Sequence, residues 1–277
     1  MSISSPDTAP AFPYRMAVFD MDDTLLGPDK KISAENRLAL DRLIATDIEV
    51  VIASGRHQSN VASFEKDLGF RGWIVSSGGA VASHAGTGEV IHEVTVPSDL
   101  GLELFRRGQK ADISIIGYHR NGIFCDAQTE WTAHYLRRTG QVPIADVPDL
   151  IGSGLQKLIW TTAAERIAEL TPKMQEEYHG RLYVVNTEHE MLEFLSPLAN
   201  KALAVQVLAR KLDIPREQII AFGDGNNDVP LLEWAGMSVA MAHGRESARR
   251  AAKMTSPPGD PGTAVARALE TFFPAIG

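Results

Sequence analysis

Two short acidic clusters have the residue types and spacing that phosphate or metal chemistry needs. The first, Asp20-Met21-Asp22-Asp23-Thr24, follows the apolar run Met16–Phe19. The second, Gly223–Asp228, follows the apolar run Ile219–Phe222. Carboxylates gathered so closely repel one another, so a cation or a shared proton is expected between them. An apolar run that stops in Asp, Gly and Asn is typical of a buried strand leading into a ligand-binding loop. We therefore expect both clusters to form one metal and phosphate site.

The first cluster contains the candidate catalytic pair, Asp20 and Asp22. Asp20 directly follows the apolar run, where the end of a strand aims its side chain into a crevice, and Asp22 reaches the same crevice if the chain turns there. One carboxylate can then attack an electrophile while its neighbour handles protons. The alternative is that Asp22, Asp23 and Thr24 only build a turn, since Asp and Thr suit turns.

The second cluster contains the candidate metal ligands Asp224 and Asp228. Both have room to bind one Mg²⁺, a hard cation that prefers carboxylate, carbonyl and water oxygens. Asn227, between them, could orient a carboxylate or bind a ligand. The sequence has no His or Cys pairs at zinc-type spacing, which argues against a zinc enzyme.

Two further positions are candidates for phosphate binding. Ser54 and Gly55 follow an apolar run at the start of a predicted helix, where a hydroxyl and backbone N–H groups can bind an anion. Lys201 begins another predicted helix, where a positive charge is unfavourable for the helix dipole unless an anion is bound there. The alternative for Lys201 is a solvated surface lysine.

The elements that must position these residues alternate as strands and helices at both ends of the chain, which indicates parallel βαβ units. In the N-terminal part we expect strands at 15–19, 49–53 and 73–75 and helices at 33–46 and 58–68. After residue 197 we expect strands at 218–222 and 238–241 and helices at 201–212, 229–234, 246–252 and 263–273. Residues 1–10 are expected to form a loose tail.

The middle of the chain changes character. The segment 81–96 is expected to form two strands around a turn, and an Asn-Gly pair at 121–122 indicates a hairpin between 113–118 and 122–126. Further strands are expected at 155–161 and 181–185, with helices at 99–110, 131–139 and 164–178. Hairpins mixed with helices suggest an α+β module. The predicted fold is α/β: a Rossmann-like three-layer core with a parallel sheet, residues 1–82 and 196–277, interrupted by an α+β domain, residues 83–195.

Composition excludes several classes of function. The net charge of -8 over 277 residues gives no reason to expect nucleic-acid binding or attraction to an anionic membrane surface. No apolar stretch is long enough to span a bilayer, and no signal-peptide pattern begins the sequence. The single cysteine, Cys125, cannot form an internal disulfide, fits a reducing cytoplasm and is expected to be an apolar filler.

The four elements in this order resemble the haloacid dehalogenase-like (HAD) phosphatase superfamily. Asp20–Thr24 matches its Asp-x-Asp-x-Thr motif, Ser54 its Ser/Thr motif, Lys201 its lysine and Gly223–Asp228 its Gly-Asp-x-x-x-Asp motif. The inserted module resembles the cap of subclass IIB, the Cof-like hydrolases. The resemblance covers the chain from about residue 15 to residue 273.

The resemblance implies a mechanism. Asp20 attacks phosphorus and forms an aspartyl-phosphate, and Asp22 protonates the leaving oxygen and then activates water. Mg²⁺ is bound by Asp20, the backbone carbonyl of Asp22 and Asp224, with Asp228 in support. Ser54, Gly55, Lys201 and Asn227 hold the phosphoryl group. This division of labour suits phosphoryl transfer, which depends on positioning and charge stabilisation.

The sequence departs from the subclass pattern at three places, where Gly78, His243 and Ala202 replace the usual Asn, Asn and Gly. The first two weaken any transfer of substrate specificity. The cap is expected to choose the substrate. Arg56, next to Ser54, is the first candidate contact, and the other candidates are His119, Arg120, Lys157, Glu188 and His189.

The predicted function is Mg²⁺-dependent hydrolysis of small cytoplasmic phosphates, with sugar phosphates first, by a monomer or small homo-oligomer. A rival is a phosphomutase of the phosphomannomutase type, which needs strongly cationic cap contacts to return the phosphoryl group to the sugar. A third reading is a non-catalytic sugar-phosphate sensor, against which the intact Asp20 and Asp22 argue.

Overall fold

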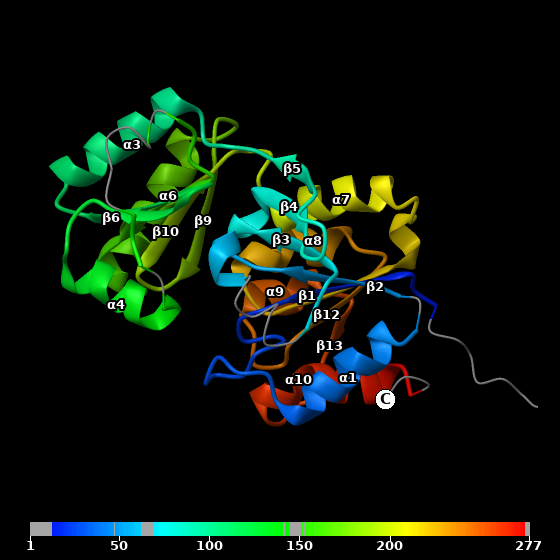
Figure 1. Ribbon diagram of the computed structural model, residues 1–277. Coiled ribbons are helices and arrows are strands. Elements are labelled where there is room, and N and C mark those ends of the chain that lie inside the picture. The colour runs from blue at the N-terminus through cyan, green and yellow to red at the C-terminus, as the bar shows by residue number, and fades with distance from the viewer. Residues whose placement is uncertain are drawn as a thin grey trace, which may run out of the picture.

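The computed structural model describes residues 13–46, 48–61, 69–140, 142–144, 151 and 153–274. Figure 1 shows two lobes, a larger one that contains both described ends of the chain and a smaller one at the upper left. The loose tail expected at 1–10 and residues 62–68 of the helix expected at 58–68 lie outside the described residues.

The larger lobe, here called the core, is built on an eight-stranded sheet of order β13-β12-β11-β1-β2-β3-β4-β5. Its strands are β1 (Met16–Asp20), β2 (Glu49–Ala53), β3 (Trp73–Ser76), β4 (Val81–His84), β5 (Val90–Glu93), β11 (Ile219–Gly223), β12 (Met237–Ala240) and β13 (Met254–Thr255). The strands from β13 to β3 are parallel, and the β4–β5 hairpin adds an antiparallel edge. Because β1 pairs with both β2 and β11, the ends of these three strands are neighbours.

Helices cover both faces of the core sheet, so the core has three layers. Alternate residues of β1 face opposite sides: Ala17 and Phe19 belong to the apolar cluster under α1 (Ala34–Ile44) and α10 (Ala264–Phe272). Met16 and Val18 belong to the cluster under three other helices. These are α7 (Lys201–Lys211), α8 (Val229–Trp234) and α9 (Glu246–Ala251). Burial on both faces explains why β1 is an uninterrupted apolar run up to its final aspartate.

The smaller lobe, here called the cap, is built on an antiparallel five-stranded sheet of order β7-β6-β8-β10-β9. Its strands are β6 (Ser114–His119), β7 (Gly122–Cys125), β8 (Lys157–Thr161), β9 (Tyr183–Glu188) and β10 (Met191–Leu195), and its helices are α3 (Ser98–Lys110), α4 (Glu130–Thr139) and α6 (Ala164–Glu177). Single turns of 3₁₀ helix complete the description: η1 (Ser77–Gly79), η2 (Arg216–Gln218), η3 (Asn226–Asp228) and η4 (Pro261–Thr263).

The two faces of the cap sheet differ. One face packs its apolar residues against α3 and α6. The other carries Tyr118, Lys157 and Glu193, which alternate with apolar residues along β6, β8 and β10. Two of these, Tyr118 and Lys157, are direct cross-strand partners. The cap sheet therefore presents charged and polar side chains on this face, among apolar residues such as Ile116 and Ile159.

The predicted fold class is confirmed: an α/β core with a largely parallel sheet carries an inserted α+β cap. Two strands were not predicted, β10 and the short β13. The β4–β5 hairpin, which the predicted boundary at residue 83 divides, hydrogen-bonds to the core sheet. β5 therefore belongs to the core sheet, and the next strand, β6, belongs to the cap sheet. The division of the chain at residues 83 and 195 stays a prediction.

Candidate active site

Asp20 ends the central strand β1 and lies at the bottom of the site. Its side chain is buried, and Lys201 Nζ donates a hydrogen bond to its Oδ1. Burial, and then the negative charge of Asp228, raise the pKa of Asp20 well above its usual range, although the charge of Lys201 acts in the opposite direction. Asp20 is thus a buried carboxylate whose negative charge is only partly compensated by the surrounding protein.

Lys201 is fully buried at the first position of α7, so the solvated-lysine reading is wrong. Asn200 caps this helix by accepting a hydrogen bond of 2.9 Å from the backbone N–H of Leu203. The ammonium group donates to Asp20 and to Asp228 Oδ1, the latter at 2.6 Å. Burial alone would lower the pKa of Lys201, but the charges of the two aspartates outweigh it and raise this pKa.

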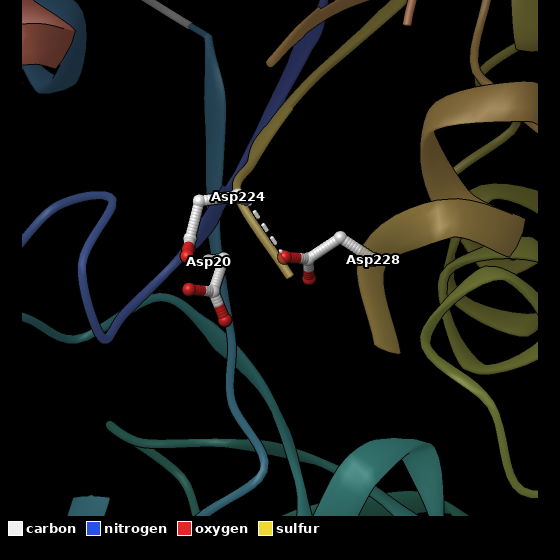
Figure 2. A group of neighbouring side chains, drawn as sticks. All are labelled: Asp20, Asp224 and Asp228. Carbon is white, nitrogen blue, oxygen red and sulfur yellow. Dashed lines mark hydrogen bonds between the residues drawn. The ribbon is translucent and has the colours of Figure 1, made fainter. Parts of the chain in front are cut away.

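The second acidic cluster forms the loop between β11 and α8. Asp228 Oδ2 accepts hydrogen bonds from the backbone N–H groups of Asp224, at 3.0 Å, and Gly225, at 2.8 Å. Thr24 Oγ1 donates to Asp224 Oδ1 at 2.8 Å and so ties the two clusters together. Figure 2 shows the side chains of Asp20, Asp224 and Asp228 gathered at one place, with the bond between Asp224 and Asp228 dashed.

These three aspartates fit a divalent cation. Each offers one carboxylate oxygen, and these oxygens lie within 4.8 Å of one another. Burial and the charge of Asp228 raise the pKa of Asp224 to about 7. Hard oxygen ligands of this kind are those that Mg²⁺ prefers.

Asp22 is held by Arg56. The guanidinium donates through Nε to Asp22 Oδ2 at 2.8 Å and through a terminal nitrogen to Oδ1 at 2.7 Å. Burial alone would raise the pKa of Asp22, but the hydrogen bonds and charge of Arg56 outweigh it, so this pKa is lowered. Arg56, predicted as a substrate contact, also lines the cavity described below. Its side chain therefore orients Asp22 and borders the site at once.

The predicted phosphate-binding residues meet beside Asp20. Ser54 is buried directly after β2, and its hydroxyl accepts a hydrogen bond of 3.1 Å from the backbone N–H of Arg56. Gly55 and Asn227 both line the cavity, and a Cβ atom on Gly55 would lie 3.7 Å from the side-chain nitrogen of Asn227. The structure thus brings the loops after β2 and β11 into contact.

A cavity of about 180 Å³ lies between core and cap. Asp20, Asp22, Arg56 and Asp224 line it from the core. From the cap it is lined by Tyr118, Tyr135, Arg138, Thr139, Lys157, Thr187, Glu188, Met191 and Glu193. Only Lys157 and Glu188 of these cap residues were among the predicted candidates. The others stand in segments whose apolar or polar patterns suit ordinary core and surface positions, so no local signal marks them.

The remaining cap candidates lie elsewhere. The backbone carbonyl of His119 contacts the core residue His57, whose Nε2 lies 2.8 Å from it. Arg120 forms an ion pair of 2.6 Å with Glu93, and His189 is exposed. None of these three lines the cavity. Cys125, outside the site as well, has its pKa raised to about 11 by burial, in keeping with the expected filler role.

Lys157 of the cap contacts the loop after β2, which carries the predicted phosphate-binding residues Ser54 and Gly55. Its ammonium is buried and donates to Glu193 Oε1 at 2.9 Å and to the backbone carbonyl of Gly55 at 2.8 Å. It also lies 4.5 Å from the centroid of the Tyr118 ring, a cation–π distance. These partners occupy the donors of the lysine, so Lys157 links cap to core as well as lining the cavity.

Two departures from the subclass pattern have local explanations. His243 Nε2 donates to the backbone carbonyl of Asp23 at 2.7 Å and so fastens the loop after β1. Gly78 adopts a φ of +71°, and an added Cβ would lie 2.9 Å from Leu195. A side chain at Gly78 would require the Leu195 side chain to move.

The fold and the site together define a class of protein: an α/β protein with an inserted cap, whose acidic loops lie at the carboxyl edge of a parallel sheet. Residues 17–269 match the model of one such family, described as haloacid dehalogenase-like hydrolase. The chain belongs to this family, as its motifs predicted.

Curated relatives and solved structures agree with this family assignment. The HMP-PP phosphatase of Serratia proteamaculans is 26% identical over 233 residues, which are 83% of this chain and 84% of that protein. A haloacid dehalogenase-like hydrolase from Bacteroides thetaiotaomicron superimposes with a TM-score of 0.81 at 26% identity and covers 94% of this chain and 100% of its own. A solved HAD subclass IIB sugar phosphatase shares the fold, with a TM-score of 0.82 at 19% identity, over 95% of this chain and 100% of its own.

The predicted membership of the HAD family, and with it the predicted HAD-type enzyme, is confirmed by this family match, and curated relatives named as phosphatases agree with it. The solved subclass IIB enzyme has the same fold as this chain. Among the helices of the described residues, none is long and apolar enough to cross a bilayer.

Proposed function

We propose that this protein is a Mg²⁺-dependent phosphomonoester hydrolase that acts on small phosphorylated metabolites, sugar phosphates first. The observation that carries the proposal is the buried Asp20, which lines the cavity between core and cap beside Lys201 and two further carboxylates. A binding protein has no need of a buried, incompletely neutralised carboxylate, and this argues against the sensor.

Asp20 is the nucleophile. Its free carboxylate oxygen attacks phosphorus, an O–P bond to Asp20 forms, and the bond from phosphorus to the leaving oxygen breaks. Asp22 supplies the proton to that oxygen, and as a carboxylate it then takes a proton from the water that cleaves the aspartyl-phosphate. In the structure Arg56 favours the ionised form of Asp22. Because Asp22 must carry a proton when the substrate is bound, we expect its hydrogen bonds to Arg56 to weaken at that stage.

The phosphoryl group is held by residues of the core. Ser54, the Gly55 backbone N–H and Asn227 provide hydrogen-bond donors, and Lys201 balances charge. The metal site is formed by Asp20, Asp224 and the backbone carbonyl of Asp22, with Asp228 in support. When bound there, Mg²⁺ would neutralise part of the charge of the phosphate and the carboxylates.

The charge of the cap favours a hydrolase over a mutase. A mutase must hold a second phosphate on the cap, which calls for unpaired cations there. The cations on the cap wall of the cavity are Lys157 and Arg138, and each is paired with a carboxylate, Glu193 and Glu188 respectively. The cap wall therefore offers no excess of positive charge.

The names of relatives guide the choice of substrates to test. One curated relative is an HMP-PP phosphatase and one solved neighbour is a sugar phosphatase. We expect this chain to share their reaction type, and the cavity of about 180 Å³ favours a small leaving group. A cytoplasmic location and a monomer or small homo-oligomer stay predictions, which cell fractionation and size-exclusion chromatography would check.

The test is phosphate release from sugar phosphates, nucleotides, HMP-PP and p-nitrophenyl phosphate. The protein is assayed with Mg²⁺ and with EDTA, next to Asp20→Asn and, as a matched control, Asp29→Asn in an exposed loop. We expect release that requires both Mg²⁺ and Asp20 and is unchanged in Asp29→Asn. Folded protein that isomerises a sugar phosphate, or binds one without releasing phosphate, would show the proposal to be wrong.

A further inference from the structure

Glu188, the last residue of β9, stands among cations on the rim of the cavity. Its carboxylate lies 3.4 Å from a terminal nitrogen of Arg138 at the end of α4. Lys30 of the core lines the same cavity, and the charge of Glu188 contributes to raising the pKa of Lys30. Glu188 therefore adds negative charge where core and cap both bring positive charge.

A third cation completes this rim. Arg245 of the core lines the cavity and donates to the backbone carbonyl of Thr187, the neighbour of Glu188, at 2.9 Å. Among the described residues it forms no ion pair. Guanidinium groups bind phosphate strongly through paired N–H donors. Without Glu188, the cavity would be lined by Lys30, Arg138 and Arg245, of which only Lys30 would keep a carboxylate partner among the described residues.

We propose that Glu188 is a specificity-determining residue, which excludes substrates with a second anionic group by pairing with Arg138 and adding negative charge to the rim that such a group would contact. The proposal rests on the proposed function, since it concerns the leaving-group side of the same site. It follows the general rule that discrimination is often built from repulsion of the wrong ligand. The favoured substrate class is a monophosphate with a neutral leaving group.

Glu188 is a better determinant than Glu193, the other carboxylate of the cap wall. The side chain of Glu193 is 7% exposed and neutralises the buried Lys157, so its loss would leave a buried charge unpaired. The side chain of Glu188 is 43% exposed, and its ion pair with Arg138 contributes little to folding. A change of Glu188 therefore alters recognition without threatening the fold.

The experiment measures binding, which does not depend on turnover. In the Asp20→Asn background, titration calorimetry in Mg²⁺ compares matched pairs: glucose 6-phosphate with glucose 1,6-bisphosphate, and fructose 6-phosphate with fructose 1,6-bisphosphate. Each pair is titrated into protein with Glu188, with Glu188→Gln and with the control Glu190→Gln. Glu190 lies on the same hairpin but does not line the cavity.

With Glu188 present, we expect the monophosphate to bind more tightly than its bisphosphate by about tenfold or more. Glu188→Gln should shift this ratio towards the bisphosphate by about tenfold, and Glu190→Gln should leave it unchanged. Three results would overturn the proposal. The bisphosphate could bind as tightly as its monophosphate when Glu188 is present, Glu188→Gln could leave the ratio of the two affinities unchanged, or no member of any pair could bind. The proposed function fails by a different result, the absence of phosphate release when Asp20 is intact.

Discussion

At the scale of single residues, Lys201 compensates the charge of two buried carboxylates. Its ammonium is buried between Asp20 and Asp228, which it contacts at the same time. Removing one member of a buried ionic group is costly because the charges left behind have neither water nor partner. The same residue thus serves both stability and the candidate site.

Lys201→Met should abolish phosphate release and lower the free energy of unfolding by about 3–5 kcal/mol in EDTA. Because the orphaned carboxylates then repel one another, Mg²⁺ should restore part of the lost stability, and more of it than Mg²⁺ adds to the unaltered protein. Urea unfolding followed by circular dichroism, with EDTA and with Mg²⁺, measures both effects.

Lys211→Met, at the other end of α7, is the matched control. Lys211 forms an exposed ion pair with Glu89 at 2.8 Å, and exposed pairs contribute less than about 1 kcal/mol. If both variants lost equal stability, or if Mg²⁺ stabilised Lys201→Met no more than the unaltered protein, the electrostatic account of Lys201 would be wrong.

At the scale of elements, the position of α7 depends on its contact with η1. Gly79 in η1 has a φ of +104°, and an added Cβ would lie 2.2 Å from the backbone carbonyl carbon of Asn200. Asn200 is the residue that caps α7, directly before Lys201. The absence of a side chain at Gly79 therefore lets the start of α7 come close enough for Lys201 to reach Asp20.

Gly79→Ala should lower the free energy of unfolding by about 2–5 kcal/mol, because it adds a close contact to an unfavourable backbone angle. It should also lower kcat, since Lys201 is displaced. Gly180→Ala is the control, with a φ of +72° and nothing within 4 Å of the added Cβ, so only backbone strain of about 1–2 kcal/mol is expected. Equal losses of stability, or an unchanged kcat in Gly79→Ala, would contradict the role given to this contact.

At the scale of the whole molecule, hydrogen bonds join core and cap, among them one between two residues that line the cavity. Lys157 contacts the Gly55 carbonyl, Asn226 donates to the Asn186 carbonyl at 2.8 Å, and His57 contacts the His119 carbonyl. Asn226 belongs to the acidic loop after β11, so the cap touches both halves of the site. The arrangement of core and cap therefore depends on contacts of the loops after β2 and β11, which carry candidate phosphate-binding and metal-binding residues.

His57, at the contact of core and cap, makes the stability of the protein depend on pH. Its Nε2 must carry a proton to donate to the His119 carbonyl, and its Nδ1 accepts from the Ser59 backbone N–H, so the neutral form fits both. Burial, with help from the charge of Lys157, lowers the pKa of His57 below its usual value of 6.5. The unfolded chain then binds a proton at a higher pH than the folded chain, and stability falls as pH drops below about 6.5.

His57→Gln keeps a donor for the His119 carbonyl and removes the titration. We expect its melting temperature to fall less steeply between about pH 7 and pH 5 than that of the unaltered protein, by an amount equivalent to at most about one proton. Some dependence should remain, since burial also lowers the pKa of His92 and His119. His179→Gln changes an exposed position of the cap, and its melting temperature should fall with pH as steeply as that of the unaltered protein. Equal slopes in all three proteins would refute the prediction.

The sequence can predict which candidate residues lie close together where their positions follow from strand order. β1, β2 and β11 are parallel neighbours, so the residues after them, Asp20, Ser54 and Asp224, share one edge of the sheet. The prediction failed where burial depends on a distant partner. β10 was missed because Glu193 interrupts its apolar run, and Glu193 is buried only because Lys157 of β8 neutralises it.

The sequence by itself determined the α/β core, the two acidic loops and the family, since apolar runs that end in Asp, Gly and Asn are local patterns. Only the tertiary structure decided that Arg56 holds Asp22, that Lys201 is buried between two aspartates and that cations of the cap are paired with carboxylates. The reason is physical: charge pairing and burial depend on which distant segments meet, and each charged residue looks the same in the sequence whether it faces water or a partner.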